Sequence, residues 1–147
     1  MSELRYQIIM FIIMVIVGMS FNPMNILAYK FEHLYVSITL FYGGLLMASN
    51  MIWAHEIIHY LYMGKFNILI FIIGIILSII ISIYLLRKQL FIDENQWLKR
   101  MISHHSTAIT TSNIIYNKTK NEKIKNLSKQ IIITQMREIE LMKSYMN

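Results

Sequence analysis

Three long stretches of this chain carry no charged residue and no histidine, and they constrain its fold more than any other feature. They cover residues 6–29, 34–54 and 66–86. A helix needs about 20 predominantly apolar residues to cross the ~30 Å hydrocarbon core of a bilayer, and each stretch is long enough. We therefore predict a transmembrane region over residues 1–88 with three spanning helices, the second of which extends to residue 63.

The rest of the chain is polar and basic. Residues 87–147 contain 11 lysines and arginines and 5 acidic residues, which accounts for the whole net charge of +6. Apolar residues recur there at helical spacing, Asp93 and Asn121 are placed to cap two helices, and a short polar turn over residues 117–121 separates them. Helices joined by so short a turn pack as antiparallel neighbours. The sequence thus predicts an all-α protein in which an antiparallel helical hairpin, residues 89–147, follows the membrane region.

The basic hairpin is not expected to bind nucleic acid, because its lysines have no interleaved arginines or aromatic residues. Next to a bilayer, such a positive charge is attracted to anionic headgroups. Two helices alone bury little apolar area, so we expect the hairpin to form a homo-oligomer or to dock on the third span.

Methionine is abundant and cysteine is absent: the chain has 12 methionines and no cysteine. This excludes disulfides, thiolate zinc sites, iron–sulfur clusters and cysteine nucleophiles. A soft metal ion would therefore depend on methionine sulfur and histidine nitrogen. Two groups of these residues stand out, one in the predicted hairpin and one along the second predicted span.

The hairpin group is centred on two adjacent histidines. Met101 and His105 are four residues apart and share a helix face, and His104 lies at the flank of Met101. The second hairpin helix adds Met136 and Met142. Thioether and imidazole ligands suit Cu(I) or Ag(I). In the alternative interpretation, the methionines fill gaps in the core and the histidines only line the seam between the helices.

The second group runs along the second predicted span, where a methionine or histidine recurs every fourth residue. Its members are Met47, Met51, His55, His59 and Met63. Neighbouring members share a helix face, although the face drifts by about 40° at each step. Ionisable residues near a membrane interface suggest a functional site. The alternative is an interfacial anchor of histidine and tyrosine with packed methionines.

The same helix contains His55, Glu56 and His59 in the spacing H-E-x-x-H, which is the signature of zinc metallopeptidases. In such enzymes the two histidines bind zinc, the glutamate acts as general base, and a third protein ligand completes the site. The available acids are Glu32, Asp93 and Glu94. With three spans they would lie across the membrane from the histidines. A metallopeptidase and a non-catalytic membrane scaffold are therefore alternatives, and our main expectation is a protein that is not an enzyme.

In the predicted hairpin, residues 96–109 include the double histidine with Met101, and residues 131–142 contain a Gln-x-x-Glu-Ile-x-x-Met pattern. These two segments together resemble domain-of-unknown-function family 305. Residues 32–37 are similar to the entry of the second span in a membrane subgroup of this family, which has three spans ahead of the domain. The resemblance implies a ferritin-like fold and binding of copper or silver ions. The ligands that it implies are Met101, His104, His105 and Met142.

This sequence departs from the family pattern at two places. Ser103 stands where the family usually has proline, so the backbone before the double histidine is less rigid. His55 and His59 fall where the membrane subgroup tends to carry methionine. The exchange keeps metal ligands but hardens the site toward Cu(II) or zinc as well as Cu(I).

The sequence and the resemblance together predict a multi-pass protein of the cell membrane, with three transmembrane helices followed by a ferritin-like antiparallel helical hairpin. We expect it to bind copper-like ions, Cu(I) foremost with Ag(I) or Zn as alternatives, and to take part in their sequestration or handling. Its expected partners are the lipid bilayer, the metal ion and a second copy of itself, bound through the hairpin.

Overall fold

The computed structural model describes residues 3–146, and this part of the chain is all-α with no strand. It forms two compact units: unit 1 consists of Met1–Phe21 and Ile38–Phe91, and unit 2 of Asn22–Ser37 and Ile92–Asn147. The helices in chain order are α1 (Glu3–Ser20), α2 (Pro23–Ile26), the 3-10 helix η1 (Phe31–His33), α3 (Ile38–Met63), α4 (Ile68–Ile80), its π-helical continuation η2 (Ile81–Arg87), α5 (Glu94–Lys118) and α6 (Glu122–Tyr145).

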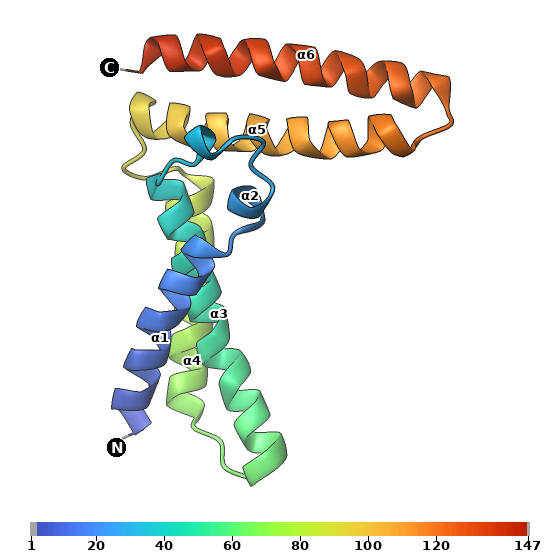
Figure 1. The fold of residues 1–147 in the computed structure, drawn as a ribbon. Coiled ribbons are helices and arrows are strands. Elements are labelled where there is room, and N and C mark those ends of the chain that lie inside the picture. The colour runs from blue at the N-terminus through green and yellow to red at the C-terminus, as the bar shows by residue number, and fades with distance from the viewer. Residues whose placement is uncertain (1–2, 147) are drawn as a thin grey trace. The chain divides into compact units, whose positions relative to one another are not determined.

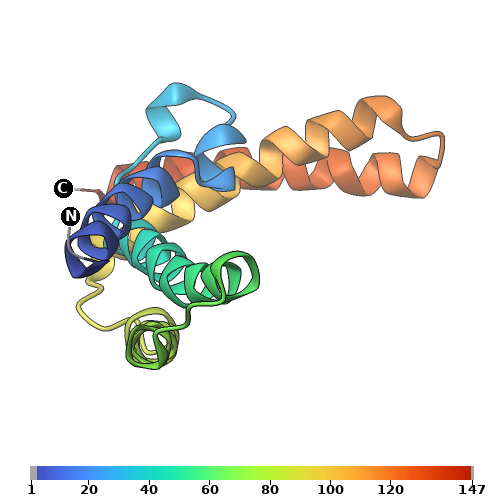
Figure 2. The same ribbon diagram turned by 90° about the horizontal axis from the view of Figure 1, so that it is seen from below.

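Unit 1 is built around α3, which packs against α1 and also against α4 with η2. Figures 1 and 2 show the three helices running alongside one another. A glycine lies at each of these two helix contacts. A Cβ on Gly44 of α3 would lie 2.8 Å from a backbone oxygen of α1, and a Cβ on Gly74 of α4 would lie 2.9 Å from a backbone nitrogen of α3. Backbones that approach so closely at small residues are typical of helix packing in membranes.

Within the described residues 3–146, two helical stretches are long and apolar enough to cross a membrane, namely Arg5–Ile26 and Ile68–Arg87. They correspond to the first and third predicted spans. Only 11% of each candidate window is buried inside the protein, so most of their isoleucines face outward. A core helix of a soluble domain would hide this surface from water, because such domains rarely expose large contiguous apolar patches.

The prediction of three spans is corrected to two candidate spans, because α3 does not reach the hydropathy of the other two helices. The second predicted span does form a helix that extends to Met63, but this helix begins at Ile38. It carries polar side chains such as Ser49, Asn50 and Glu56, and both Ser49 and Glu56 are fully buried. The central helix can hold these groups because its neighbours α1 and α4 surround part of it.

The first predicted span, residues 6–29, is not one helix. Helix α1 ends at Ser20. Asn22 then caps the short helix α2 by accepting a hydrogen bond from the backbone N–H of Met24 at 3.0 Å. Proline at the first position of α2 suits a new helix start, where no N–H donor is needed. The segment from Asn22 to Ser37 belongs to unit 2, where α2 and η1 pack on α5.

Unit 2 contains the predicted antiparallel hairpin, formed by α5 and α6 (Figure 1). Both predicted caps are confirmed. The Asp93 side chain accepts a hydrogen bond from the Gln96 N–H at 2.7 Å, and Asn121 accepts from the Lys123 N–H at 3.0 Å. The buried core between the two helices consists of Leu98, Ile102, Ile109, Ile139 and Met142.

Candidate functional site

The predicted hairpin ligands meet at the seam between α5 and α6, around His105. Its Nδ1 lies 2.8 Å from the carbonyl oxygen of Met101, one helical turn earlier. Its Nε2 lies 2.9 Å from Oε2 of Glu138 on α6. Gln135 donates a hydrogen bond to the same carboxylate oxygen at 3.1 Å. The imidazole is 12% exposed and the Glu138 side chain 44%, so the pair can be reached from outside.

This contact pairs an imidazole nitrogen with a carboxylate oxygen, and what it can bind depends on where the ring carries its proton. Because a carbonyl oxygen can only accept, the hydrogen bond to Met101 places a proton on Nδ1 of His105. Nε2 then presents a lone pair to the Glu138 carboxylate, and two acceptors 2.9 Å apart repel unless a cation lies between them. A proton meets this need by forming imidazolium. A metal ion meets it as well, since histidine ligands commonly bond one nitrogen to a carbonyl and the other to the metal.

Of the other predicted hairpin ligands, one is exposed and two belong to the packing of the hairpin core. His104 is exposed, and its ring centroid lies 6.1 Å from that of His105. Desolvation and the neighbouring charges of His105 and Arg100 lower the pKa of His104 below its usual 6.5, which favours the neutral form that binds metals. Met142 is only 7% exposed and lies in the hairpin core, and Met101 packs against that core.

Met136 does not line the same part of the hairpin as His105. It borders a small cavity of about 50 Å³ together with His33, Ile109 and Ile139. The structure therefore joins His105 to Glu138, a residue that is not among the predicted ligands, and uses the thioethers of Met101 and Met142 mainly for packing. The signal for Glu138 was its place in the Gln-x-x-Glu motif on α6.

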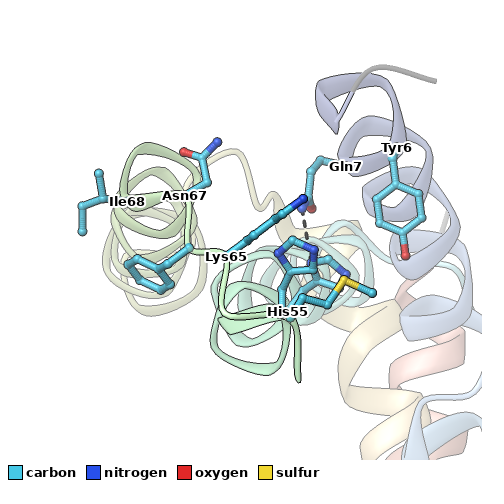
Figure 3. Close-up of a pocket in the computed structure, with 9 residues that line it drawn as sticks. Tyr6, Gln7, His55, Lys65, Asn67 and Ile68 are labelled. Atoms are coloured by element: carbon cyan, nitrogen blue, oxygen red, sulfur yellow. Dashed lines mark hydrogen bonds between the residues drawn. The ribbon is translucent and has the colours of Figure 1, made fainter. Parts of the chain in front are cut away.

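The predicted ligands of α3 lie partly at a cavity of about 780 Å³ in unit 1 (Figure 3). Of the five residues in this ladder, His55, His59 and Met63 line the cavity, whereas Met47 and Met51 are not among its lining residues. The rings of His55 and His59 stack with centroids 5.9 Å apart and an interplanar angle of 16°. The remaining lining residues are Tyr6, Gln7, Lys65, Phe66, Asn67 and Ile68.

The glutamate of the H-E-x-x-H motif lies behind this cavity and is fully buried. Oε1 of Glu56 accepts a hydrogen bond from Gln7 Nε2 at 3.1 Å, and Oε2 accepts one from the backbone N–H of Asn67 at 3.1 Å. Glu56 thereby links α1, α3 and the start of α4. A general base must reach the water or substrate that it deprotonates, so this position does not favour the metallopeptidase alternative.

Among the described residues, no group of three or more histidine, aspartate or glutamate side chains is arranged to hold a metal ion. A metal site in residues 3–146 would therefore combine at most two such side chains with other donors. The two histidine positions above have this composition, with amide and thioether groups close by.

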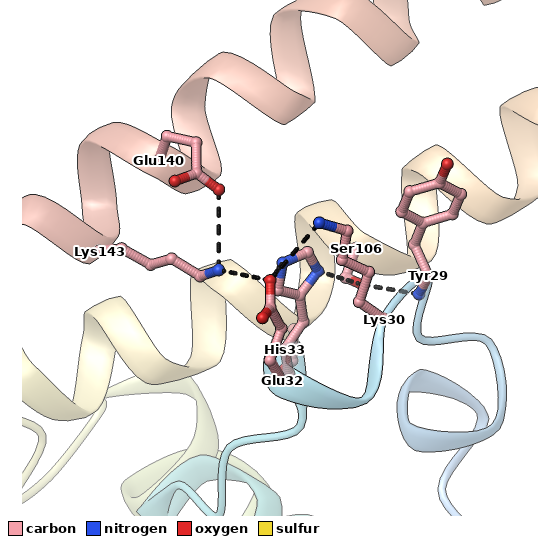
Figure 4. A network of polar contacts seen from close by, with 8 residues as sticks. Tyr29, Lys30, Glu32, His33, Ser106, Glu140 and Lys143 are labelled. Carbon is pink, nitrogen blue, oxygen red and sulfur yellow. Dashed lines mark hydrogen bonds and ion pairs between the residues drawn. The ribbon is translucent and has the colours of Figure 1, made fainter.

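A third polar cluster, around His33, was not identified as a site from the sequence (Figure 4). The His33 ring is buried, and its Nδ1 lies 3.0 Å from Oγ of Ser106 on α5, which also accepts a hydrogen bond from the Tyr29 N–H at 2.7 Å. The Ser103 hydroxyl donates to the His33 carbonyl at 2.9 Å. These bonds fasten the segment Asn22–Ser37 to the hairpin, and the only sequence signal for them was the resemblance over residues 32–37.

Charged side chains cover the outer side of this cluster. Lys143 on α6 lies 3.0 Å from Oε1 of Glu32 and 3.7 Å from Glu140. The hydrogen bond and the positive charge of Lys143 lower the pKa of Glu32. Burial lowers the pKa of His33, and this effect outweighs the attraction of Glu32 for the protonated ring. His33 is therefore expected to be neutral at neutral pH, which suits a structural hydrogen-bonding role.

Comparison with known proteins gives two matches. The family model described as Domain of unknown function (DUF305) matches residues 91–146, which are the α5–α6 hairpin. "Uncharacterized protein L153" of Acanthamoeba polyphaga mimivirus is 38% identical over 143 residues, which cover 96% of this chain and 91% of the viral protein. The likeness thus extends through both units. No solved structure matches the chain.

Proposed function

This chain belongs to the same family as the mimivirus protein L153, and we propose that it is a membrane-anchored protein that binds a copper-like metal ion in its C-terminal hairpin. The contact that carries the proposal is the pair His105–Glu138, in which an imidazole nitrogen and a carboxylate oxygen from different helices lie 2.9 Å apart. Metal bonds to imidazole nitrogen and carboxylate oxygen are about 2 Å long, so one ion can bridge acceptors at this separation.

The ligand set of this proposal starts from His105 Nε2 and the Glu138 carboxylate. His104 and Gln135 are close enough to these residues to contribute, because the His104 ring neighbours His105 and Gln135 already contacts Glu138. A thioether from Met101 or Met142 would have to leave the core to bind. The nitrogen and oxygen donors shift the expected preference from Cu(I) or Ag(I) toward Cu(II) or Zn(II). Sequestration or handling of the ion, without a chemical reaction, remains the proposed role.

Two features support the membrane part of the proposal. The outward faces of α1 and α4 carry a belt of isoleucines, and the candidate spans Arg5–Ile26 and Ile68–Arg87 are buried over only 11% of their windows. In a bilayer this surface would face acyl chains. The proposed location is a cell membrane, which the two candidate spans would cross.

We also propose that the hairpin associates with a second copy of the chain. Its helices retain exposed apolar side chains, among them Ile114, Ile115, Leu127 and Ile133. Two helices bury less area than a stable domain needs, and a second hairpin would supply the missing partner surface. Sedimentation of the full chain in detergent micelles should give the mass of a dimer, and a monomer at all concentrations would contradict this.

Metal titration of the full chain in detergent micelles tests the hairpin site. Competition with a chelator of known affinity should give binding of Cu(II) or Zn(II) that weakens by roughly tenfold or more in His105→Ala and in Glu138→Gln. The matched control is Glu140→Gln, which removes an exposed carboxylate from the same helix and should leave the affinity unchanged. Helical content measured on each variant checks folding. Equal affinities for the wild type and both site variants would reject the site and favour a scaffold whose histidines only pack.

A further inference from the structure

We propose that the 780 Å³ cavity of unit 1 binds the phosphate headgroup of an anionic phospholipid, with the Lys65 ammonium group and the Nε2–H of His55 as donors. This inference rests on the membrane anchoring proposed above. It does not depend on the hairpin metal site, with which the cavity shares no residue. The inference is carried by the place of the cavity, the proton on His55, the charge of Lys65 and the apolar surface beside them.

The cavity lies where both candidate spans begin. Its lining includes Tyr6 and Gln7, in the first turn of the span Arg5–Ile26, and Ile68, the first residue of the span Ile68–Arg87. The end of α3 supplies the rest of the wall together with the turn that follows it, and Figure 3 shows these helix ends around the lining residues. In a bilayer, a cavity at this end of both spans lies at the level of the lipid headgroups.

The hydrogen bonds of Gln7 determine where His55 carries its proton. An amide nitrogen can only donate, and Gln7 Nε2 lies 3.3 Å from Nδ1 of His55 and 3.1 Å from Oε1 of Glu56. Nδ1 is therefore an acceptor, and the neutral ring carries its proton on Nε2. Among the described residues no group accepts a hydrogen bond from this Nε2–H, and the side chain is 24% exposed. His55 thus presents a donor at the cavity, and not a lone pair for a metal ion.

Lys65 brings a positive charge to the same cavity. The residue is exposed, it forms no ion pair with a described side chain, and the cavity lining contains no acidic residue. Gly64 places it there, because its φ of 65° lets the chain leave α3 after the Gly64 N–H has bonded the Tyr60 carbonyl at 2.9 Å. An ammonium group next to a phosphate oxygen makes a charge-assisted hydrogen bond, which is stronger than a neutral one.

Apolar surface lies directly beside these donors. Met63, Phe66 and Ile68 line the cavity, and each is more than 40% exposed. The Phe66 ring is held in place by Tyr60 and Phe71, whose ring centroids lie 5.8 Å and 5.2 Å from its own. A phospholipid joins a phosphate to acyl chains, so it can meet the donors and cover the apolar surface at once. A free phosphate ion would leave this surface in water, which is unfavourable.

The charges at the cavity favour an anion over a cation. A cation would meet the Lys65 ammonium group and the Nε2–H of His55. The carboxylate of Glu56 lies behind His55 without exposed surface, and its oxygens already accept hydrogen bonds from Gln7 Nε2 and the Asn67 N–H at 3.1 Å each. With one lysine in the lining, the site matches a phosphodiester with a single negative charge.

The test uses the full chain in micelles of a non-ionic detergent, with bound lipid counted by native mass spectrometry. We expect one tightly bound phosphatidylglycerol, and weaker binding of phosphatidylcholine, whose own cation would meet Lys65. Lys65→Gln should weaken phosphatidylglycerol binding by about tenfold or more, because a charge-assisted bond is lost. His55→Phe keeps a ring but removes the donor, and should weaken binding by roughly threefold. The matched control Lys88→Gln removes the same charge just beyond the other end of the span Ile68–Arg87 and should leave the affinity unchanged.

Further measurements separate this inference from its alternatives. Glycerol 3-phosphate has the phosphate without acyl chains, so binding as tight as that of phosphatidylglycerol would overturn the lipid assignment in favour of a soluble phosphate compound. The proposal is also overturned if Lys65→Gln binds as tightly as the wild type, or if Lys88→Gln weakens binding equally, since general positive charge would then explain the attraction. Flotation with liposomes tests the anchoring itself. A chain that stays out of liposomes overturns both proposals, whereas a chain that floats but binds no phosphatidylglycerol in micelles overturns only the cavity site.

Discussion

The helices within unit 1 and the helices within unit 2 pack through residues of different size. The α5–α6 hairpin closes on a core of large side chains that includes Ile102, Ile109 and Ile139, each no more than 1% exposed. In unit 1 the buried positions at the helix contacts include Gly44, Ala48 and Ser49, while most isoleucines face outward. The hairpin is therefore built as a protein in water is built, with apolar groups inside.

The packing of unit 1 follows a different logic. Where both the inside and the outside of a bundle are apolar, burial of isoleucine provides little driving force, and close backbone contacts and interhelical hydrogen bonds matter more. Ser78 of α4 donates such a bond to Ser49 of α3 at 3.1 Å. We therefore expect truncation of a large buried side chain to destabilise unit 2, and enlargement of a small buried residue to destabilise unit 1.

The largest expected effect is the truncation of a core residue in the hairpin. Ile102→Ala should destabilise unit 2 by about 2–5 kcal/mol, because it removes buried methylene groups and leaves a cavity. Ile114→Ala on the same helix, at a position that is 45% exposed, should have a much smaller effect. Hydrogen exchange of α5 and α6 in the full chain measures both variants. Similar protection in the two variants would show that the hairpin is not stabilised by this core.

The next largest effect is the enlargement of a glycine in unit 1. Gly44→Leu should separate α1 from α3 and destabilise unit 1 by about 1–3 kcal/mol or more, because even a Cβ would lie 2.8 Å from the carbonyl oxygen of Val15. Ile16→Leu, on the outward face of α1, is the control and should change little. Thermal unfolding in detergent, with hydrogen exchange of α1 and α3, measures the difference. If Gly44→Leu matched its control, the close-packing account of unit 1 would be wrong.

Features that depend on neighbours in the sequence were predictable. The caps Asp93 and Asn121 fix the starts of α5 and α6, and the spacing of Met101 and His105 places them one turn apart on α5. Each of these follows from helix geometry within a few residues. The all-α fold and the hairpin followed for the same reason.

Features that depend on long-range contacts were not predictable. The bond from Gln7 to Glu56 joins residues 49 positions apart, and the contact of His33 with Ser106 joins residues 73 positions apart. The lack of charged residues over residues 34–54 led to the prediction of a span, but α3 also carries polar side chains that face other helices, and these lower its mean hydropathy. Apolar composition also placed residues 22–37 in the membrane region, whereas hydrogen bonds to serines of α5 attach this segment to the hairpin.

The smallest expected effect is a pH dependence of the stability of unit 2. Burial lowers the pKa of His33 below 6.5, and the groups that face its ring are Glu32, Lys30, Lys143 and Glu140. The unfolded chain therefore binds a proton more readily than unit 2 does. The stability that this histidine contributes is complete above about pH 6.5 and declines as the pH falls through 6.5 toward the lower pKa of the folded state.

Hydrogen exchange of the full chain between pH 5 and pH 7.5, corrected for the intrinsic pH dependence of exchange, should thus show α5 and α6 losing protection at low pH. His33→Gln should flatten this dependence. His104, whose pKa is also lowered by desolvation, contributes in the same direction, and His104→Gln should remove only its own share. Glu32 does not contribute in this range, because Lys143 holds its pKa below the usual 4.5. An unchanged pH profile in His33→Gln would mean that the segment Asn22–Ser37 stays docked with a charged His33, and that its attachment to α5 rests on the serine hydrogen bonds alone.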